Sequence, residues 1–151
     1  SAAEMLDARF DFDARIALNG GAAGTASARD MLSRGHFKLW TSGRTVTTAL
    51  IADHEGKTFD IGVDAYKSLR PVFEVQFWPA VSKARVRVIL EATDTEKIQN
   101  QDYDVTVATG AASPAPVLSA TGVKHNFMSR WTRVFWIGGG PPPRGLHYCP
   151  G

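Results

Sequence analysis

Apolar and polar side chains alternate over several short stretches of this chain, most clearly from Arg70 to Ala92. Two runs in this stretch each place an apolar side chain at every second position. The apolar positions are Phe73, Val75 and Phe77 in the first run, and Val86, Val88 and Leu90 in the second. Successive side chains of a β-strand point to opposite faces of the sheet, so the pattern predicts an antiparallel hairpin with one buried face.

The two faces together predict the register of this hairpin, with its turn around Pro79–Ala84. The expected pairs are Phe77 with Val86, Val75 with Val88 and Phe73 with Leu90 on the buried face, and Trp78 with Arg85 and Gln76 with Arg87 on the polar face. A slip of one residue would turn Arg85 and Arg87 into the core, so the assignment of faces is strongly constrained.

Other segments with the same alternation predict further strands. We expect strands at residues 9–18, 36–40, 44–52, 59–63, 103–108, 117–121, 123–128 and 131–137. Residues 22–35 are expected to form a surface loop with a short turn near 28–32, and residues 64–69 a single helical turn. Roughly eight to ten short strands without an amphipathic helix predict an all-β fold, an antiparallel β-sandwich of jelly-roll or immunoglobulin-like type.

The first and last of these strands differ in what their two sides carry. Segment 9–18 has Phe10, Phe12, Ala14, Ile16 and Leu18 on one side, and Asp11, Asp13 and Arg15 on the other. This pattern predicts a half-buried strand with solvated carboxylates. Segment 131–137 is largely apolar on both sides, which predicts a strand that is covered on both faces or lies at an interface.

Length and composition indicate one globular domain. The chain has 151 residues, of which 44% are hydrophobic and 21% charged, and this suits a single sizeable core. We expect one β-sandwich domain at residues 1–140 and a Pro/Gly-rich tail at residues 141–151. Because the chain begins with Ser1, we expect a processed or excised chain. The tail indicates either a fragment of something longer or a segment that docks on a neighbouring molecule.

Charge and hydropathy argue against two kinds of partner. The net charge is +2, and no Lys/Arg cluster along the sequence is dense enough to indicate a nucleic-acid-binding face. No apolar run is long enough to span a membrane. We therefore predict no nucleic-acid partner and no membrane span.

No pattern of metal ligands is present, and we predict no metal site and no cofactor. His36, His54, His125 and His147 fall in no metal-ligand spacing. His54 is expected in a solvated turn, and His125 at a core or edge position of its strand. The single Cys149 excludes an intrachain disulfide and a Cys-based zinc site.

The candidates for catalysis are two carboxylate pairs, Asp11/Asp13 and Asp102/Asp104. Carboxylates two residues apart on a strand share a face at a separation of about 7 Å, which glycosidases use. Both pairs lie on the side opposite a predicted core face, so we expect them to be solvated and not catalytic. No nucleophile motif is present, and these observations disfavour an enzyme.

The feature that points most directly to function is aromatic. Among the four tryptophans, Trp78 lies on the polar face of the central hairpin with Gln76, Arg85 and Arg87, and these four residues form the candidate ligand-binding surface. Three interpretations of Trp78 remain open. It stacks on a sugar ring, or it packs on the stem of Arg85 as a cation–π pair, or one of Trp78 and Trp136 is buried at a subunit contact.

Three segments, ARVRVILEATD, YDVTV and VKHNFMSRWTRVFWIGG, resemble β-sandwich accessory domains of secreted bacterial proteins, some of which degrade polysaccharides. This resemblance covers about the central half of the chain. It rests on the general residue pattern of the strands more than on an invariant motif. It implies a domain without catalytic residues, in an extracellular or cell-surface location. No binding position is transferred from it.

These observations predict a non-catalytic extracellular β-sandwich that binds carbohydrate or another protein. The alternative is a structural subunit of a virion, a phage tail or an extracellular filament, because a sandwich with apolar strand faces suits self-assembly that buries its edges. An enzyme is the third possibility.

Overall fold

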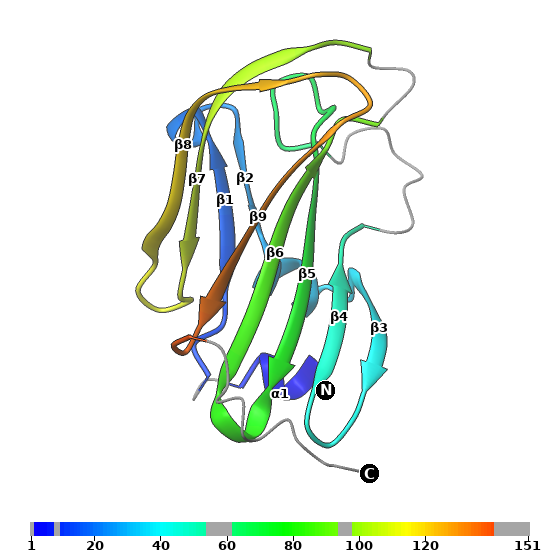
Figure 1. The fold of residues 1–151 in the computed structure, drawn as a ribbon, viewed down its shortest axis with the longest axis vertical. Coiled ribbons are helices and arrows are strands. Elements are labelled where there is room, and N and C mark those ends of the chain that lie inside the picture. Colours follow the sequence, from blue (N-terminus) through cyan, green and yellow to red (C-terminus); the bar gives the residue numbers. More distant parts are fainter. Residues whose placement is uncertain (1, 8–9, 54–61, 94–97, 141–151) are drawn as a thin grey trace.

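The computed structural model describes residues 2–7, 10–53, 62–93 and 98–140, which form two antiparallel β-sheets packed face to face (Figure 1). One sheet has the strand order β2-β1-β7-β8, formed by β1 Ala14–Leu18, β2 Gly24–Ser27, β7 Gln101–Thr109 and β8 Ala115–His125. The other has the order β3-β4-β5-β6-β9, formed by β3 Phe37–Ser42, β4 Thr47–Ile51, β5 Arg70–Trp78, β6 Lys83–Glu91 and β9 Arg130–Ile137. The predicted all-β sandwich is confirmed.

The core lies between the two sheets and contains the predicted apolar faces. In the five-stranded sheet Phe73, Val75, Phe77, Val86, Val88 and Leu90 are all buried, and in the four-stranded sheet Ala14, Ile16, Leu18, Tyr103, Val105 and Val107 are buried. Because every second residue of these strands points inward, the residues between them form the two outer faces of the molecule.

The register predicted for the central hairpin is wrong by two residues. The structure pairs Phe77 with Ala84, Val75 with Val86 and Phe73 with Val88, and on the outer face Trp78 with Lys83 and Gln76 with Arg85. The turn is tighter than expected, because a short 3-10 segment η2 (Pro79–Val81) is followed by Ser82 in the left-handed conformation. A shift of two residues leaves every side chain on its predicted face.

The expected loop at residues 22–35 contains two regular elements, strand β2 and helix α2 (Ala28–Ser33). Ser27 precedes the helix as its N-cap, and its side chain accepts a hydrogen bond from the backbone N–H of Asp30. Strand β2 consists of small residues without alternation, and it is formed by pairing with β1. The sequence therefore gave no periodic signal for it.

Asp13 is buried, contrary to the prediction of a solvated carboxylate. It is 1% exposed. Its carboxylate accepts hydrogen bonds from the Ser27 hydroxyl, at 2.9 and 3.0 Å, and from the backbone N–H of Arg29 at 3.0 Å. Strand β1 begins only at Ala14, so Asp13 precedes the strand and faces the start of α2. Asp11 is exposed as predicted.

Several other elements of the structure differ in detail from the predicted ones. The two short strands expected at 117–121 and 123–128 form one strand, β8, with Gly122 at a positive φ of 61° where the pairing with β7 shifts register. Residues 64–69 form a turn that is not helical. Short helical segments occur at α1 (Ala2–Met5) and η1 (Asn19–Gly21).

Some predictions fall outside the described residues. The strand expected at 59–63 is described only at its last two positions, and the turn with His54 is not described. The tail at 141–151, which contains His147 and Cys149, also lies outside the description.

Candidate functional site

The outer face of the five-stranded sheet carries a continuous row of polar and aromatic side chains. Cross-strand pairing places Thr41 beside Thr48, Thr48 beside Gln76, Gln76 beside Arg85, and Arg85 beside Trp136. We call these five residues, one from each strand, the central row. Strands lie about 4.8 Å apart, so the row spans roughly 19 Å. Thr48 is 9% exposed, and the other four residues are more open to solvent.

Trp78 and Trp136 stack on one another at one end of this face. Their ring centroids are 5.4 Å apart and their planes differ by 25°. Both parent strands pair with β6, so the backbones are separated by two strand spacings, about 9.6 Å. The two indoles therefore lean toward each other above β6, and the stack links the edge strand β9 to β5.

Close contacts between the end of β9 and the β5–β6 turn lie next to this stack. Gly138 follows β9 with φ of 80°, and a Cβ at this position would lie 2.2 Å from the carbonyl oxygen of Ser82 in the β5–β6 turn. Only glycine allows both that conformation and that close approach. The ammonium of Lys83 also donates a hydrogen bond to the carbonyl of Gly140 at 3.1 Å. The end of β9 is thus held against the turn that follows Trp78.

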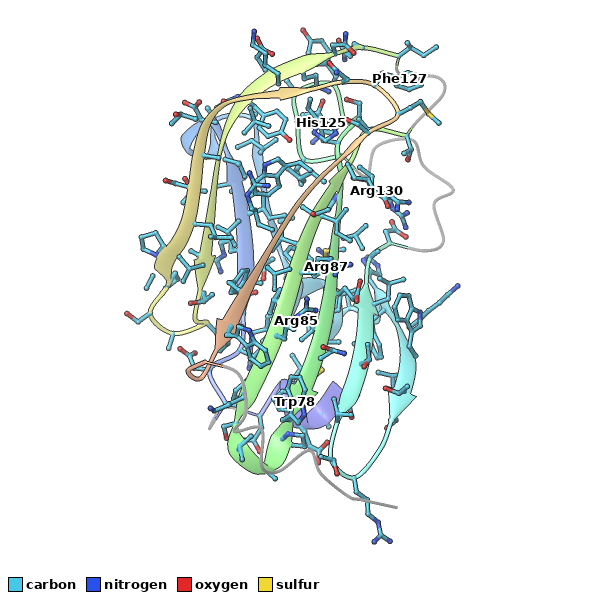
Figure 2. The ribbon with its side chains drawn as sticks, in the orientation of Figure 1. Trp78, Arg85, Arg87, His125, Phe127 and Arg130 are labelled. Atoms are coloured by element: carbon cyan, nitrogen blue, oxygen red, sulfur yellow. The ribbon has the colours of Figure 1, made fainter. Side chains whose placement is uncertain are left out.

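Basic side chains are concentrated on the same outer face. The described outward positions carry the basic residues Lys38, Arg70, Lys83, Arg85, Arg87 and Arg130, and the acidic residues Glu74 and Glu91. Figure 2 shows Trp78, Arg85, Arg87 and Arg130 following one another along the sheet. Six basic and two acidic side chains on one face contrast with a net charge of +2 for the whole chain.

Ion pairs neutralise only part of this face. Arg87 lies 3.8 Å from the carboxylate of Glu74. Glu91 is shared by Arg130 at 3.0 Å and Arg70 at 3.5 Å. No ion pair or hydrogen bond of a described residue involves the guanidinium of Arg85.

All four residues of the predicted ligand-binding surface lie on this face. Gln76 and Arg85 are direct cross-strand neighbours, whereas Trp78 pairs with Lys83 and Arg87 with Glu74. Of the three interpretations left open for Trp78, the cation–π pair with Arg85 is not formed among the described residues, and the Trp78 ring stacks on Trp136 instead. Whether the surface binds a ligand remains a prediction.

The sequence did not reveal which residues complete the face. Alternation marks outward positions within one strand, but the neighbours Thr41, Thr48 and Trp136 come from three other strands. Their place depends on strand order, for which the sequence carries no local signal. For residues 131–137, the prediction of a strand covered on both faces by this chain is wrong, since β9 is an edge strand with Trp131 and Phe135 buried and Val134 exposed on the outer side. The alternative, a strand at an interface, stays a prediction.

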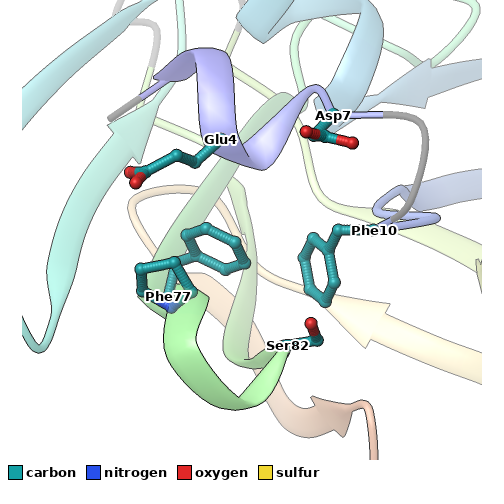
Figure 3. Close-up of a pocket in the computed structure, with 6 residues that line it drawn as sticks. Glu4, Asp7, Phe10, Phe77 and Ser82 are labelled. Carbon is teal, nitrogen blue, oxygen red and sulfur yellow. The ribbon is translucent and has the colours of Figure 1, made fainter.

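A cavity of about 330 Å³ lies at one end of the sandwich, between α1 and the β5–β6 turn. It is lined by Glu4, Asp7, Phe10, Phe77, Pro79 and Ser82. Figure 3 shows the two carboxylates on the α1 side and the two rings and the hydroxyl facing them. Both carboxylates take part in other interactions of the fold. We assign no reaction to this cavity.

A larger groove, of about 680 Å³, lies along β2 and α2. Its charged lining includes Arg15, Arg34, Lys67, Asp30 and Asp53. These charges engage one another or the fold, as in the ion pairs of Arg34 with Asp30 and Arg15 with Asp13. The groove therefore has mixed charge and no single type of ligand that its chemistry favours.

Asp64 is a buried carboxylate with a structural role. It is 3% exposed and accepts hydrogen bonds from the backbone N–H groups of Ser68 and Leu69, at 2.6 and 2.7 Å, and from the Ser68 hydroxyl at 2.8 Å. Burial alone would raise its pKa, but these hydrogen bonds outweigh burial and lower the pKa below the ordinary value of 3.8. The ionised group fixes the turn that leads into β5.

His125 and Tyr103 form a second buried polar pair. The Nε2 of His125 lies 2.9 Å from the carbonyl of Ser129, which can only accept, so this nitrogen carries the proton. Nδ1 then accepts from the Tyr103 hydroxyl at 2.7 Å. Burial raises the pKa of Tyr103 well above its ordinary value. His125 is thus a hydrogen-bonded core residue, as the sequence predicted.

Within the described part of the chain, no three side chains of the metal-ligating types gather at one place, and no helix has the length and hydropathy to cross a membrane.

Comparisons with family models, with the sequences of characterised proteins and with solved structures give no match. The resemblance to accessory domains of secreted proteins therefore remains a prediction.

Proposed function

We propose that this chain is a non-catalytic extracellular domain that binds carbohydrate through the outer face of its five-stranded sheet. The observation that supports this most strongly is the central row with the adjoining Trp78–Trp136 stack. Sugars present hydroxyls and an apolar ring face to a protein. Threonine, glutamine and arginine side chains bind hydroxyls, and an indole packs on the apolar face.

Three observations favour binding over catalysis. Of the two carboxylate pairs, Asp13 is held by structural hydrogen bonds and Asp102 and Asp104 are exposed to solvent. Asp104 accepts a hydrogen bond from the backbone of Gly122. Neither of the two cavities described above is lined by a residue of the central row, and an open sheet surface suits a polymer more than a reaction that must exclude water.

The edges of both sheets disfavour the alternative, a subunit that assembles by strand pairing. Strand β2 has four residues, β3 carries an irregularity between Leu39 and Thr41, and β8 contains Pro116 and two register shifts in its pairing with β7. Strand β9 directs the charged Arg133 to the core side, over the ring of Trp131. Each of these features opposes edge-to-edge association.

The test is a glycan array together with pull-downs on insoluble polysaccharides. We expect signal from the wild-type chain, a loss in Trp78→Ala, and a loss in Gln76→Ala, which leaves the aromatic stack intact. Tyr66→Ala is the matched control, because Tyr66 is a 62% exposed aromatic residue outside both sheets. Circular dichroism establishes that each variant is folded.

Three results would contradict the proposal. The wild-type chain gives no signal with any glycan, or binding survives in both Trp78→Ala and Gln76→Ala. In the second case the binding surface lies elsewhere. A control variant that loses binding as strongly as the other two would also exclude this face as the specific site.

A further inference from the structure

We infer that the preferred ligand is an acidic polysaccharide whose sugars carry carboxylates. This inference rests on the proposed function, since it names the class of carbohydrate that the same face would bind. It follows from the charge of the face, which is independent of the aromatic stack.

Basic side chains outnumber acidic ones on the outer face of the five-stranded sheet. Six basic and two acidic side chains occupy the described outward positions of the five-stranded sheet, although the chain as a whole has a net charge of +2. The remaining charge is therefore acidic on balance. A basic face on a nearly neutral protein attracts anions to that face and orients them before contact.

Two of the cations that remain available, Lys83 and Arg85, lie on β6 near the aromatic stack, and the third, Lys38, lies on the edge strand β3. Glu74 pairs with Arg87, and Glu91 pairs with both Arg70 and Arg130. Lys38, Lys83 and Arg85 form no ion pair with a described residue. Lys83 donates a hydrogen bond to the neutral carbonyl of Gly140, which leaves its charge uncompensated.

Arg85 is the residue best placed to recognise a carboxylate. It lies in the central row between Gln76 and Trp136, and Lys83 is two positions away on the same face of β6. A guanidinium binds a carboxylate through two parallel hydrogen bonds, a geometry that an ammonium cannot reproduce. A uronic acid could therefore present its carboxylate to Arg85 and its ring to the exposed side of Trp136.

The number of free cations favours a polysaccharide over a nucleic acid. Nucleic-acid binding depends chiefly on Lys and Arg side chains that neutralise backbone phosphates, for example about six to ten of them. Among the described residues of this face, three basic side chains are unpaired, and a row of amide and hydroxyl groups accompanies them. Sparse charge among hydrogen-bonding side chains matches a polymer of hydroxylated sugars in which the carboxylate is one group among several.

The test compares polygalacturonate with its fully methyl-esterified form by isothermal titration calorimetry on the whole chain. The two polymers share one backbone and differ only in charge. We expect binding to the ester to be roughly tenfold weaker, since a charge-assisted hydrogen bond is replaced by a neutral one. Arg85→Gln should weaken binding to polygalacturonate by a similar factor and binding to the ester by a smaller one, because glutamine still binds hydroxyls, so that the preference for the acid falls.

Lys124→Gln is the matched control, because it removes one positive charge from the outer side of the four-stranded sheet. It should leave both affinities within about twofold. Single-stranded oligo-dT, cellulose and xylan are titrated in parallel. If oligo-dT binds more tightly than polygalacturonate and is equally sensitive to Arg85→Gln, the ligand is a nucleic acid and the inference is wrong.

The outcomes separate the inference from the proposed function. Equal binding of polygalacturonate and its ester, or binding of cellulose or xylan in preference to both, would overturn the acidic class and leave carbohydrate binding intact. Binding to none of the polysaccharides would overturn both. An Arg85→Gln variant that binds polygalacturonate as the wild type does would exclude the site.

Discussion

Asp13 illustrates how one side chain can depart from the pattern around it. Alternation placed it on a solvated face, yet its carboxylate accepts hydrogen bonds from Ser27 and Arg29 and is buried. The polar partners come from a segment that the sequence predicted as an irregular loop. Periodicity within one strand contains no information about such a partner, so this error could not be avoided from the sequence.

Replacing Asp13 should therefore destabilise the fold. We expect Asp13→Ala to lower the free energy of unfolding by about 2–3 kcal/mol, because the N–H of Arg29 loses its acceptor in a buried site. Asp102→Ala, at an exposed strand position, should change it by less than about 0.5 kcal/mol. Urea denaturation measures both, and equal effects of the two changes would contradict the structural role of Asp13.

Asp64 should make stability depend on pH at the acid end. Its pKa is lowered in the folded chain, so its contribution is complete above the unfolded value of 3.8 and is lost as the pH falls through the lower folded pKa. Asp64→Asn keeps the shape but not the charge, and should cost about 1–2 kcal/mol at pH 7. In denaturation curves from pH 7 to pH 2, the difference between wild type and variant should shrink below pH 3.8. A constant difference would exclude this explanation.

At the scale of elements, the sequence predicted most strands and their buried faces but not the register of the central hairpin. Apolar alternation specifies the face of each side chain, and a shift by two residues leaves that face unchanged. The turn decides between such registers, and here Ser82 adopts a left-handed conformation that favours a shorter connection. The candidate residues Gln76 and Arg85 were therefore placed on the right face but with the wrong neighbours.

The contact between the Trp78 and Trp136 rings should stabilise the position of the edge strand β9 in the sheet. Each of Trp78→Ala and Trp136→Ala removes the ring contact, so the double variant should cost less than the sum of the two. We expect a coupling energy of about 0.5–1.5 kcal/mol, typical of aromatic pairs. A double-mutant cycle by chemical denaturation measures it. Additive effects within error would show that the two rings do not stabilise each other.

At the scale of the whole molecule, the property that most favours an acidic ligand is the excess of basic side chains on the outer face of the five-stranded sheet. The basic residues of the outer face come from four strands and alternate with apolar ones, so no cluster appears along the sequence. Strand order brings them together, and strand order depends on long-range pairing that no local pattern specifies. The chemistry of single strands was predictable, and the surface that they form together was not.

The protected edges predict that the chain does not assemble by strand pairing. Because each edge carries a short strand, an irregularity, a proline or an inward-directed charge, we expect a monomer at high concentration. Size-exclusion chromatography with light scattering measures the mass directly. Concentration-dependent fibres or large particles, seen by negative-stain microscopy, would favour the structural-subunit alternative instead.

The most direct test of the proposed binding face is a heteronuclear NMR titration of the labelled chain with trigalacturonate and with its neutral methyl ester. We predict chemical-shift changes at Gln76, Arg85 and Trp136 on the outer face of the five-stranded sheet, larger with the acid than with the ester. Changes confined to the outer face of β7 and β8, or to the cavity beside α1, would contradict the account, as would the absence of changes with both ligands.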